Sequence, residues 1–195
     1  LIEAKDKKLK ITATDLDMIF VHNISNVEIN EEGETTTNSS IMHDIVRKFS
    51  IGKKINVETI TESKLQLESE KSIFKLNTID AKEFPLSEDD LTGDDITLNS
   101  QSFLKLLNKC KFSISSDETR HYLSGIFLHF TQNEDKNYLT AVSTDSHRMS
   151  ISKMRLDQSI NFEPIILPKK TIHHLCSLLE NLNGNIKILN SKSKI

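Results

Sequence analysis

The stretch STDSHRMS, residues 143–150, places a serine, an aspartate and a histidine side by side. These are the side chains of a hydrolase triad, in which an aspartate orients the histidine that activates a serine. Known triads assemble from distant parts of a chain, whereas Asp145, Ser146 and His147 are consecutive. On a strand, Asp145 and His147 share one face and Ser146 points to the other. No serine lies in a Gly-x-Ser-x-Gly turn, so a hydrolase using Ser146 or Ser143 with His147 is the weaker alternative.

The spacing of the acidic residues and the small number of glycines argue against a metal site and a phosphate-binding loop. A calcium loop of the EF-hand type needs acidic residues at alternate positions, followed by glycine and glutamate. Glu88, Asp89 and Asp90 are consecutive instead, which is typical of a solvated linker. Five glycines in the whole chain leave little material for a phosphate-binding loop. The sequence therefore predicts no metal site and no cofactor.

The composition is that of a globular protein in water. The chain has 195 residues, of which 36% are apolar and 27% charged, which suffices for two small cores. No run of eighteen apolar residues occurs, so no membrane span is expected. Cys110 and Cys176 lie far apart without metal-type spacing, which predicts two buried thiols in a reducing, cytoplasmic setting.

Three segments have apolar residues at helical spacing, and the expected helices span residues 39–49, 99–112 and 168–184. Ser39 or Ser40 is the expected N-cap of the first helix. Their apolar stripes are Ile41, Ile45 and Phe49; Phe103, Leu104, Leu107 and Cys110; and Ile172, Leu175, Leu179 and Leu182. Asn99 or Ser100 begins the second helix, and Pro168 and Gly184 bound the third. Alternating segments predict strands at residues 8–24, 54–61, 64–69, 72–79, 122–131, 138–154 and 186–189.

The polar faces of all three expected helices are basic. They carry Arg47 and Lys48, then Lys105 and Lys109, then Lys169 and Lys170. For a single helix, lysines that merely face water would explain this pattern. Three basic faces in a protein of net charge −3 indicate instead a surface that faces phosphates.

An internal repeat divides the chain. ITATDLDM at residues 11–18 resembles AVSTDSHRM at residues 141–149, with the shared Thr-Asp pairs 130 residues apart. The same shift moves the first expected helix onto the third, so one order of elements is expected twice: strand, Thr-Asp corner, strand, loop, helix and strand. A repeat of this length predicts duplicated domains, at residues 1–90 and 91–195, joined by an acidic linker. Because Asp15 and Asp145 occupy the same repeated corner, a structural role is favoured over a partner contact.

Five collinear segments resemble the family of bacterial DNA polymerase III beta subunits, the replicative sliding clamps. They are ITATDLDM, KEFP, DETRHYLSGIFLHF, AVSTDSHRMS and IILPKK, and the resemblance runs along essentially all 195 residues. It implies an α+β DNA-clamp fold of repeated domains, with antiparallel sheets outside and helices lining the inner face. Family members form a head-to-tail homodimeric ring with three domains per chain. We therefore expect this sequence, which resembles most of the first two domains, to belong to a longer protein.

The resemblance implies a non-enzymatic clamp that encircles double-stranded DNA and tethers the polymerase. Phosphate contacts are independent of base sequence, which suits sliding. By position in the matching segments, His121, Tyr122 and Lys170 fall where family members touch DNA. Family members often carry two aromatic residues where this chain has His121 and Tyr122. The alternative from another class is a duplicated α/β scaffold that binds only protein, with solvated lysines and no salt-dependent affinity for DNA.

The resemblance also gives the STDSHRMS stretch a role as one wall of a surface pocket. Replicative polymerases, the ATP-driven clamp loader and repair proteins dock there through short linear peptides. The implied pocket residues are Leu123, Thr144, Ser146, His147, Arg148 and Met149. The family usually has glycine at Ser146 and often leucine at Met149, so Ser146 is expected to narrow the pocket and Met149 to adapt. The opposite wall is expected beyond Ile195.

Overall fold

The structure, a computed structural model, describes residues 1–85, 95–117, 119–157, 159–190 and 195. The chain divides into two compact units, Leu1–Glu88 and Asp89–Ile195. The boundary expected between residues 90 and 91 lies outside the described residues, as do Glu88, Asp89 and Asp90 of the expected acidic linker.

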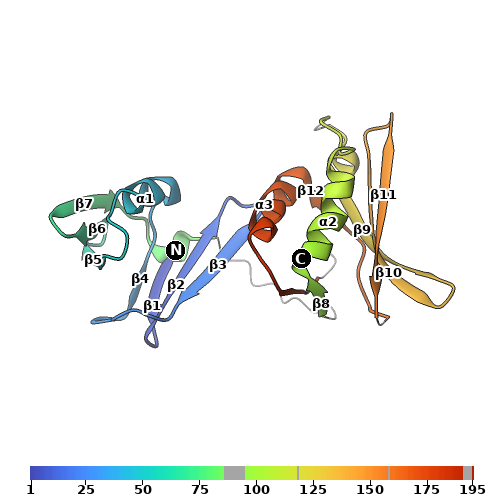
Figure 1. The fold of residues 1–195 in the computed structure, drawn as a ribbon. Helices are drawn as coiled ribbons and strands as arrows, with labels where there is room; N and C mark the ends of the chain where they lie inside the picture. Colours follow the sequence, from blue (N-terminus) through green and yellow to red (C-terminus); the bar gives the residue numbers. More distant parts are fainter. Residues whose placement is uncertain (86–94, 118, 158, 191–194) are drawn as a thin grey trace. The chain divides into compact units, whose positions relative to one another are not determined.

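The described residues of the first unit form two antiparallel sheets and one α-helix (Figure 1). The first sheet has the order β3-β2-β1-β4, with β1 at Ile2–Lys5, β2 at Lys8–Thr14, β3 at Ile19–Ile24 and β4 at Gly33–Thr35. Helix α1, Ser39–Val46, follows. The second sheet has the order β5-β6-β7, at Asn56–Thr61, Lys64–Ser69 and Ser72–Asn77, and a 3-10 turn at Ala81–Glu83 follows it.

The second unit places two helices against a four-stranded antiparallel sheet. Strand β8, Ile96–Asn99, leads into α2, Ser100–Lys111, and a 3-10 turn at His121–Leu123 follows. The sheet has the order β11-β10-β9-β12, at Met149–Leu156, Lys136–Thr144, Gly125–Asn133 and Ile165–Pro168. Helix α3, Lys169–Glu180, then leads to β13, Asn185–Ile188, which pairs with β8.

The two units repeat one order of elements, and this confirms the predicted repeat. The sheets β3-β2-β1-β4 and β11-β10-β9-β12 have the same antiparallel connectivity, and each is followed by a helix and a strand. Each of the segments 8–24 and 138–154 forms two strands joined by a turn at the Thr-Asp corner, as the repeated order of strand, corner and strand predicts. Residues 122–124 were also predicted as strand, but they lie in and directly after the 3-10 turn, and β9 begins only at Gly125.

Side-chain caps determine where two of the helices begin. The Asn38 carboxamide accepts a hydrogen bond from the Ile41 N–H at 3.0 Å, so the predicted cap at Ser39 or Ser40 was wrong by one or two residues. Asn99 caps α2 in the same way through the Ser102 N–H, as predicted. Helix α3 ends at Glu180, short of the predicted stop at Gly184.

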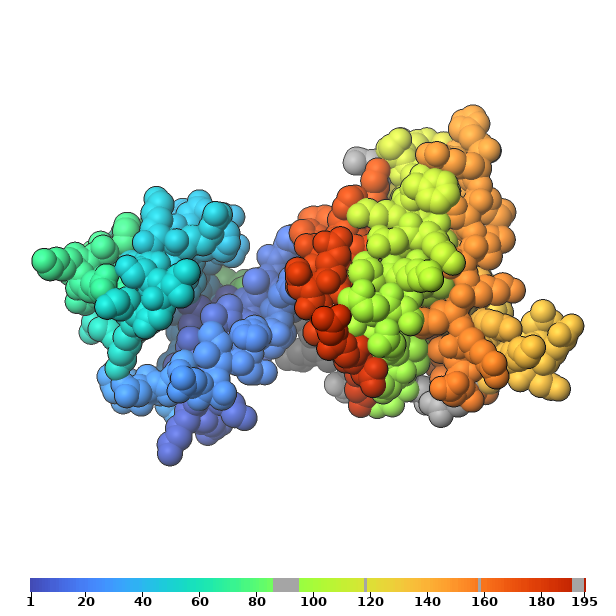
Figure 2. Space-filling model, in the orientation of Figure 1, coloured from blue at the N-terminus to red at the C-terminus, as the bar shows by residue number. Residues whose placement is uncertain are grey.

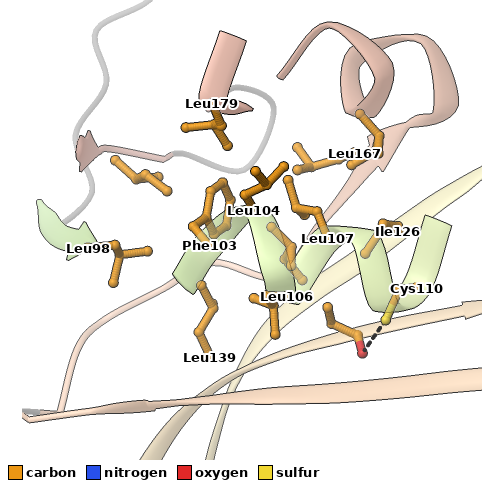
Figure 3. Packing of buried hydrophobic residues seen from close by; sticks show 14 of the residues in the cluster. Leu98, Phe103, Leu104, Leu106, Leu107, Cys110, Ile126, Leu139, Leu167 and Leu179 are labelled. Atoms are coloured by element: carbon orange, nitrogen blue, oxygen red, sulfur yellow. Dashed lines mark hydrogen bonds between the residues drawn. The ribbon is translucent and has the colours of Figure 1, made fainter. Parts of the chain in front are cut away.

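The core of the second unit lies between the helices and the sheet (Figure 3). Phe103 and Leu107 of α2 are 2% and 0% exposed, and they pack with Ile126 and Leu139 of the sheet. Full burial of each such side chain contributes about 1.5–3 kcal/mol. The predicted stripe of α3 needs one correction, because Leu182 lies beyond the helix and is 43% exposed.

The core of the first unit is smaller. Leu65, Leu67 and Leu76 of the second sheet are buried with Ile2, and the half-buried Met42, Ile45 and Phe49 pack against them. Ile41, predicted as a core residue of α1, is 54% exposed, and Met42 takes its place. Both choices fit helical spacing, so periodicity alone could not separate them.

Candidate functional site

The turn that joins β10 to β11 is closed by two of its own side chains. The Thr144 hydroxyl donates to the Arg148 carbonyl at 2.7 Å and accepts from the Ser146 N–H at 3.2 Å. The Asp145 carboxylate accepts from the N–H groups of His147 and Arg148 at 3.1 and 3.0 Å. These bonds hold the backbone in one conformation, as is typical of threonine and aspartate in turns.

The same turn recurs between β2 and β3. The Thr14 hydroxyl donates to the Met18 carbonyl at 2.8 Å, and Asp15 accepts from the N–H groups of Asp17 and Met18. The residue after the aspartate has a positive φ in both turns, 76° at Leu16 and 77° at Ser146. The prediction that the repeated aspartate is a structural corner is therefore confirmed. A positive φ also gives a physical reason for glycine at this position in the resembling family.

The three residues of the hydrolase alternative do not form a triad. The Asp145 carboxylate binds backbone N–H groups and the Arg148 side chain, and the hydrogen bond from the His147 N–H leads the interactions that lower its pKa. The Ser146 hydroxyl accepts from Arg120, and the buried Ser143 hydroxyl donates to the Cys110 carbonyl at 2.6 Å. Asp145 to Arg148 form the turn between β10 and β11, so the two faces of a strand do not apply to them. The arrangement is structural.

The segment after α2 meets this turn. The Arg120 guanidinium donates to the Ser146 hydroxyl at 2.8 Å, and the Arg148 guanidinium lies 5.5 Å from the centre of the Phe112 ring. Both contacts lie at the end of the unit where α2 ends and β10 turns into β11, the upper end in Figure 1. The Ser115 N–H donates to the Leu123 carbonyl at 3.0 Å, which ties the 3-10 turn to the same segment.

The structure places five of the predicted pocket residues in or beside this turn: Thr144, Ser146, His147, Arg148 and Met149. Leu123 is half-buried in the 3-10 turn that follows the Arg120 segment. Met149 is 61% exposed, and Phe112 and Tyr122 are 60% and 68% exposed. Arg148 links Phe112 to this turn, and exposed apolar side chains of this kind are typical of interaction sites.

The sequence prediction of this surface missed Arg120 and Phe112. A usable signal was present, because DETR and DSHR both place an arginine three residues after an aspartate. In each case the arginine Nε donates to that aspartate, at 2.8 Å for Arg120 and 2.9 Å for Arg148. The repeated spacing marks two arginines that are oriented by the same device.

Four of the basic residues predicted to face DNA are exposed on α2 and α3, whereas Arg47 and Lys48 are exposed directly after α1, which ends at Val46 and not at the predicted Phe49. In the part of the chain that the structure describes, no carboxylate forms an ion pair with Arg47, Lys48, Lys105 or Lys109. Lysines elsewhere do pair, with Lys53 lying 3.1 Å from Glu70, while Lys54 pairs with Glu28. A neighbouring carboxylate therefore neutralises the charge of Lys53 and of Lys54. Among the described residues, no carboxylate does so for Lys105 or Lys109.

The second unit gathers this charge on two neighbouring helices. Figure 2 shows α2 (green) and α3 (red) side by side on one face of the unit. Lys105 and Lys109 project from α2, and Lys169 and Lys170 begin α3. Helix α2 contains no acidic residue. Two adjacent basic helices form a surface of the kind that attracts phosphates.

The other predicted DNA-facing residues have different surroundings. Arg47 and Lys48 line a hollow of about 360 Å³ at the end of α1 together with Asp44, which reduces the net charge there. His121 and Tyr122 are exposed in the 3-10 turn of the second unit, close in sequence to the predicted pocket residues.

No helix in the described ranges is long and apolar enough to span a membrane.

Comparison with known proteins gives the same assignment for both units. Residues 1–88 match the family model described as DNA polymerase III beta subunit, N-terminal domain, and residues 97–195 match the model of its central domain. The beta sliding clamp of Rickettsia felis is 32% identical over 197 residues, which cover 100% of this chain and 50% of the relative. That of Escherichia coli strain K12 is 30% identical, covering 96% of this chain and 50% of the relative.

Solved structures show the same fold. A crystal structure of the C. crescentus beta sliding clamp has a TM-score of 0.92 at 27% identity, and covers 98% of this chain and 51% of the solved chain. A DnaN sliding clamp from Bartonella birtlesii bound to griselimycin has a TM-score of 0.89 at 31% identity, with 98% and 51% covered. The chain therefore spans about half the length of the relatives that it matches.

Proposed function

The chain belongs to the family of DNA polymerase III beta subunits, and from this premise we propose that the full-length protein is a replicative sliding clamp. It is a cytoplasmic, homodimeric ring that encircles duplex DNA and tethers the polymerase without itself catalysing a reaction or binding a cofactor. The observation that carries the proposal is the match of both units, in order, to consecutive domains of one clamp family.

The exposed charge of the helices supports the DNA-binding part of the proposal. Arg47, Lys48, Lys105, Lys109 and Lys169 make no ion pair within the described residues, so their charge is available to phosphates. Phosphate contacts supply affinity without base recognition, and a tether that moves along any sequence needs such contacts. His121, Tyr122 and Lys170 belong to the same proposed surface by their positions in the family segments.

The surface around the β10–β11 turn supports a second role, the docking of partners. Exposed Met149 and Phe112 offer apolar contact, and Arg148 and His147 offer polar contact beside them. We assign this surface, with Leu123, to short peptides of the polymerase, the clamp loader and repair proteins. An exposed apolar surface with a few polar groups suits a peptide that places one or two apolar anchors against it.

A primer-extension assay with the polymerase of the source organism tests the tethering function. The full-length protein, with its loader, should lengthen the products made in one binding event, because a tethered polymerase cannot diffuse away. Product lengths equal to those of the polymerase alone would contradict the proposal.

The docking role has its own test in the same assay. Replacing His147 and Met149 together by alanine should shorten products while leaving the dimer intact by size-exclusion chromatography. A matched change at Ile19 and Val21, exposed on the equivalent strand β3 of the first unit, should leave product length unchanged. Full activity of the His147 and Met149 variant would remove these residues from the docking surface.

A further inference from the structure

The four-stranded sheet of the second unit has one face that no helix of the described unit covers. Helices α2 and α3 pack on the other side (Figure 1), where side chains such as Leu128 and Leu139 are fully buried. Successive side chains of a strand point to opposite faces, so the neighbours of these residues point away from the helices. We call that side of the sheet the outer face. Its residues Phe127, Ile151 and Ile166 are 37%, 60% and 38% exposed.

Three rings lie on the outer face of the two central strands. Phe127 and His129 alternate along β9, and their rings stack with centroids 4.8 Å apart at an interplanar angle of 23°. Tyr138 of β10 pairs with Thr131, the next outward residue of β9, so its ring belongs to the same face. The Lys153 ammonium lies 5.7 Å from the centre of the Tyr138 ring. Aromatic and cationic groups are therefore interleaved on one surface.

The strands of this sheet carry positive charge and no negative charge. None of the four contains an aspartate or a glutamate. Lys153 and Arg155 alternate along β11, where they pair with Thr140 and Tyr138 and share the outer face with them. Neither cation forms an ion pair within the described residues. In a protein of net charge −3, this surface is complementary to an anionic ligand.

The repeated sheet of the first unit lacks both features on its corresponding face. Glu3 of β1 lies there between Glu34 of β4 and Lys10 of β2, and its carboxylate forms an ion pair with Lys10 at 2.9 Å. Phe20 of β3 pairs with Ala13 and lies on the opposite face. The shared fold therefore does not require the rings and free cations that the second sheet presents.

We propose that the outer face of the second-unit sheet is a binding site for single-stranded DNA. The bases stack on the rings of Phe127, His129 and Tyr138. The phosphates contact Lys153 and Arg155. A four-stranded sheet with aromatic residues on its surface is a known type of platform for unpaired bases, and aromatic stacking combined with cations binds single strands with little sequence preference.

Single-stranded DNA, not duplex, fits this surface because the base faces must be open for stacking. A polymerase that the proposed clamp tethers copies a single-stranded template, which supplies this ligand beside the protein. To this extent the inference rests on the proposed function. Binding of the single strand can nevertheless be measured without a polymerase or a loader, so the two can fail separately.

The test measures the affinity of the full-length protein for a labelled oligothymidine of about 16 nucleotides by fluorescence polarisation. Phe127→Leu combined with Tyr138→Leu removes two rings and keeps apolar side chains on both strands. Each lost stacking contact should weaken oligothymidine binding by about fivefold to 150-fold. The Tm of this variant and its affinity for a duplex of the same length should stay at their wild-type values.

The charge of the outer face has its own pair of variants. Lys153→Gln with Arg155→Gln should make the slope of log oligothymidine affinity against log salt shallower by about 0.7 per cation, or about 1.4 for the pair. The matched control is Lys8→Gln with Lys10→Gln, which removes two cations at the same spacing from the corresponding face of β2. The control should keep the wild-type slope.

The contrary outcomes are distinct. Absence of oligothymidine binding, or wild-type affinity in both outer-face variants, overturns the inference. Loss of that binding in Lys105→Gln with Lys109→Gln also overturns it, because the strand would then follow α2. Tighter binding of an oligouridine of equal length contradicts the assignment to DNA. If the outer-face variants shorten primer-extension products and keep their oligothymidine affinity, the face docks a protein and the inference fails.

The proposed function and this inference have separate readouts. A protein that lengthens primer-extension products but does not bind oligothymidine keeps the proposed function and loses only the single-strand site. A protein that binds oligothymidine through the outer face but does not lengthen products keeps the site and loses the proposed function.

Discussion

Replacing Lys105 and Lys109 together by glutamine should weaken DNA binding by an amount that depends on salt. The two lysines lie four residues apart on α2, are exposed, and have no ion-pair partner among the described residues. If each neutralises one phosphate, the slope of log affinity against log salt should become shallower by about 0.9 per lysine, or about 1.8 for the pair. Raising the salt from 50 to 200 mM should therefore weaken DNA binding about 12-fold less in the variant than in the wild type.

The assay is the affinity of the full-length protein for a short linear duplex at several salt concentrations. The matched control replaces Lys53 and Lys54 by glutamine, which changes net charge equally. These lysines already pair with Glu70 and Glu28, so they have little charge to offer phosphates. The control should keep the wild-type slope.

Two results would refute this reasoning. An unchanged slope in the Lys105 and Lys109 variant would remove α2 from the DNA surface. Equal changes in both variants would mean that DNA responds to the net charge of the protein and not to a local basic face.

Three further predictions concern stability. Leu107→Ala should lower the free energy of unfolding, measured by urea denaturation, by about 3 kcal/mol because it opens a cavity at a fully buried site. Ile41→Ala, at an exposed site, should lower it by less than about 0.5 kcal/mol. Asn99→Ala should lower the free energy of unfolding by about 1 kcal/mol because it removes the N-cap of α2. Faster hydrogen exchange of the amides in the first turn of α2 would report this loss. Burial and the neighbouring Lys153 lower the pKa of His129 below its ordinary 6.5. The unfolded chain therefore binds a proton first, and stability should fall as pH drops below about 6.5, but not in His129→Gln.

Local chemistry made the repeat and its corner predictable. Thr144 and Asp145 bond to groups at most four residues away, so the residue types alone carry the information. The caps were predicted to within one or two residues for the same reason.

Contacts between distant segments were not visible in the sequence. The Arg120–Ser146 bond joins residues 26 positions apart, and nothing in either segment specifies the partner. Lys53 and Lys54 follow Arg47 and Lys48 closely in the sequence, and only the fold places Glu70 and Glu28 beside them. Pairing across the fold decides which charges remain available, and sequence spacing does not report it.

Retention on closed DNA tests the central claim most directly. The full-length protein should be loaded by its clamp loader onto a nicked circular duplex, washed at moderate salt, and the DNA then cut once. A ring that encircles the duplex should remain on the circle and slide off after linearisation. Equal retention on both forms would indicate ordinary electrostatic binding, and absence from both would favour a scaffold that binds only protein.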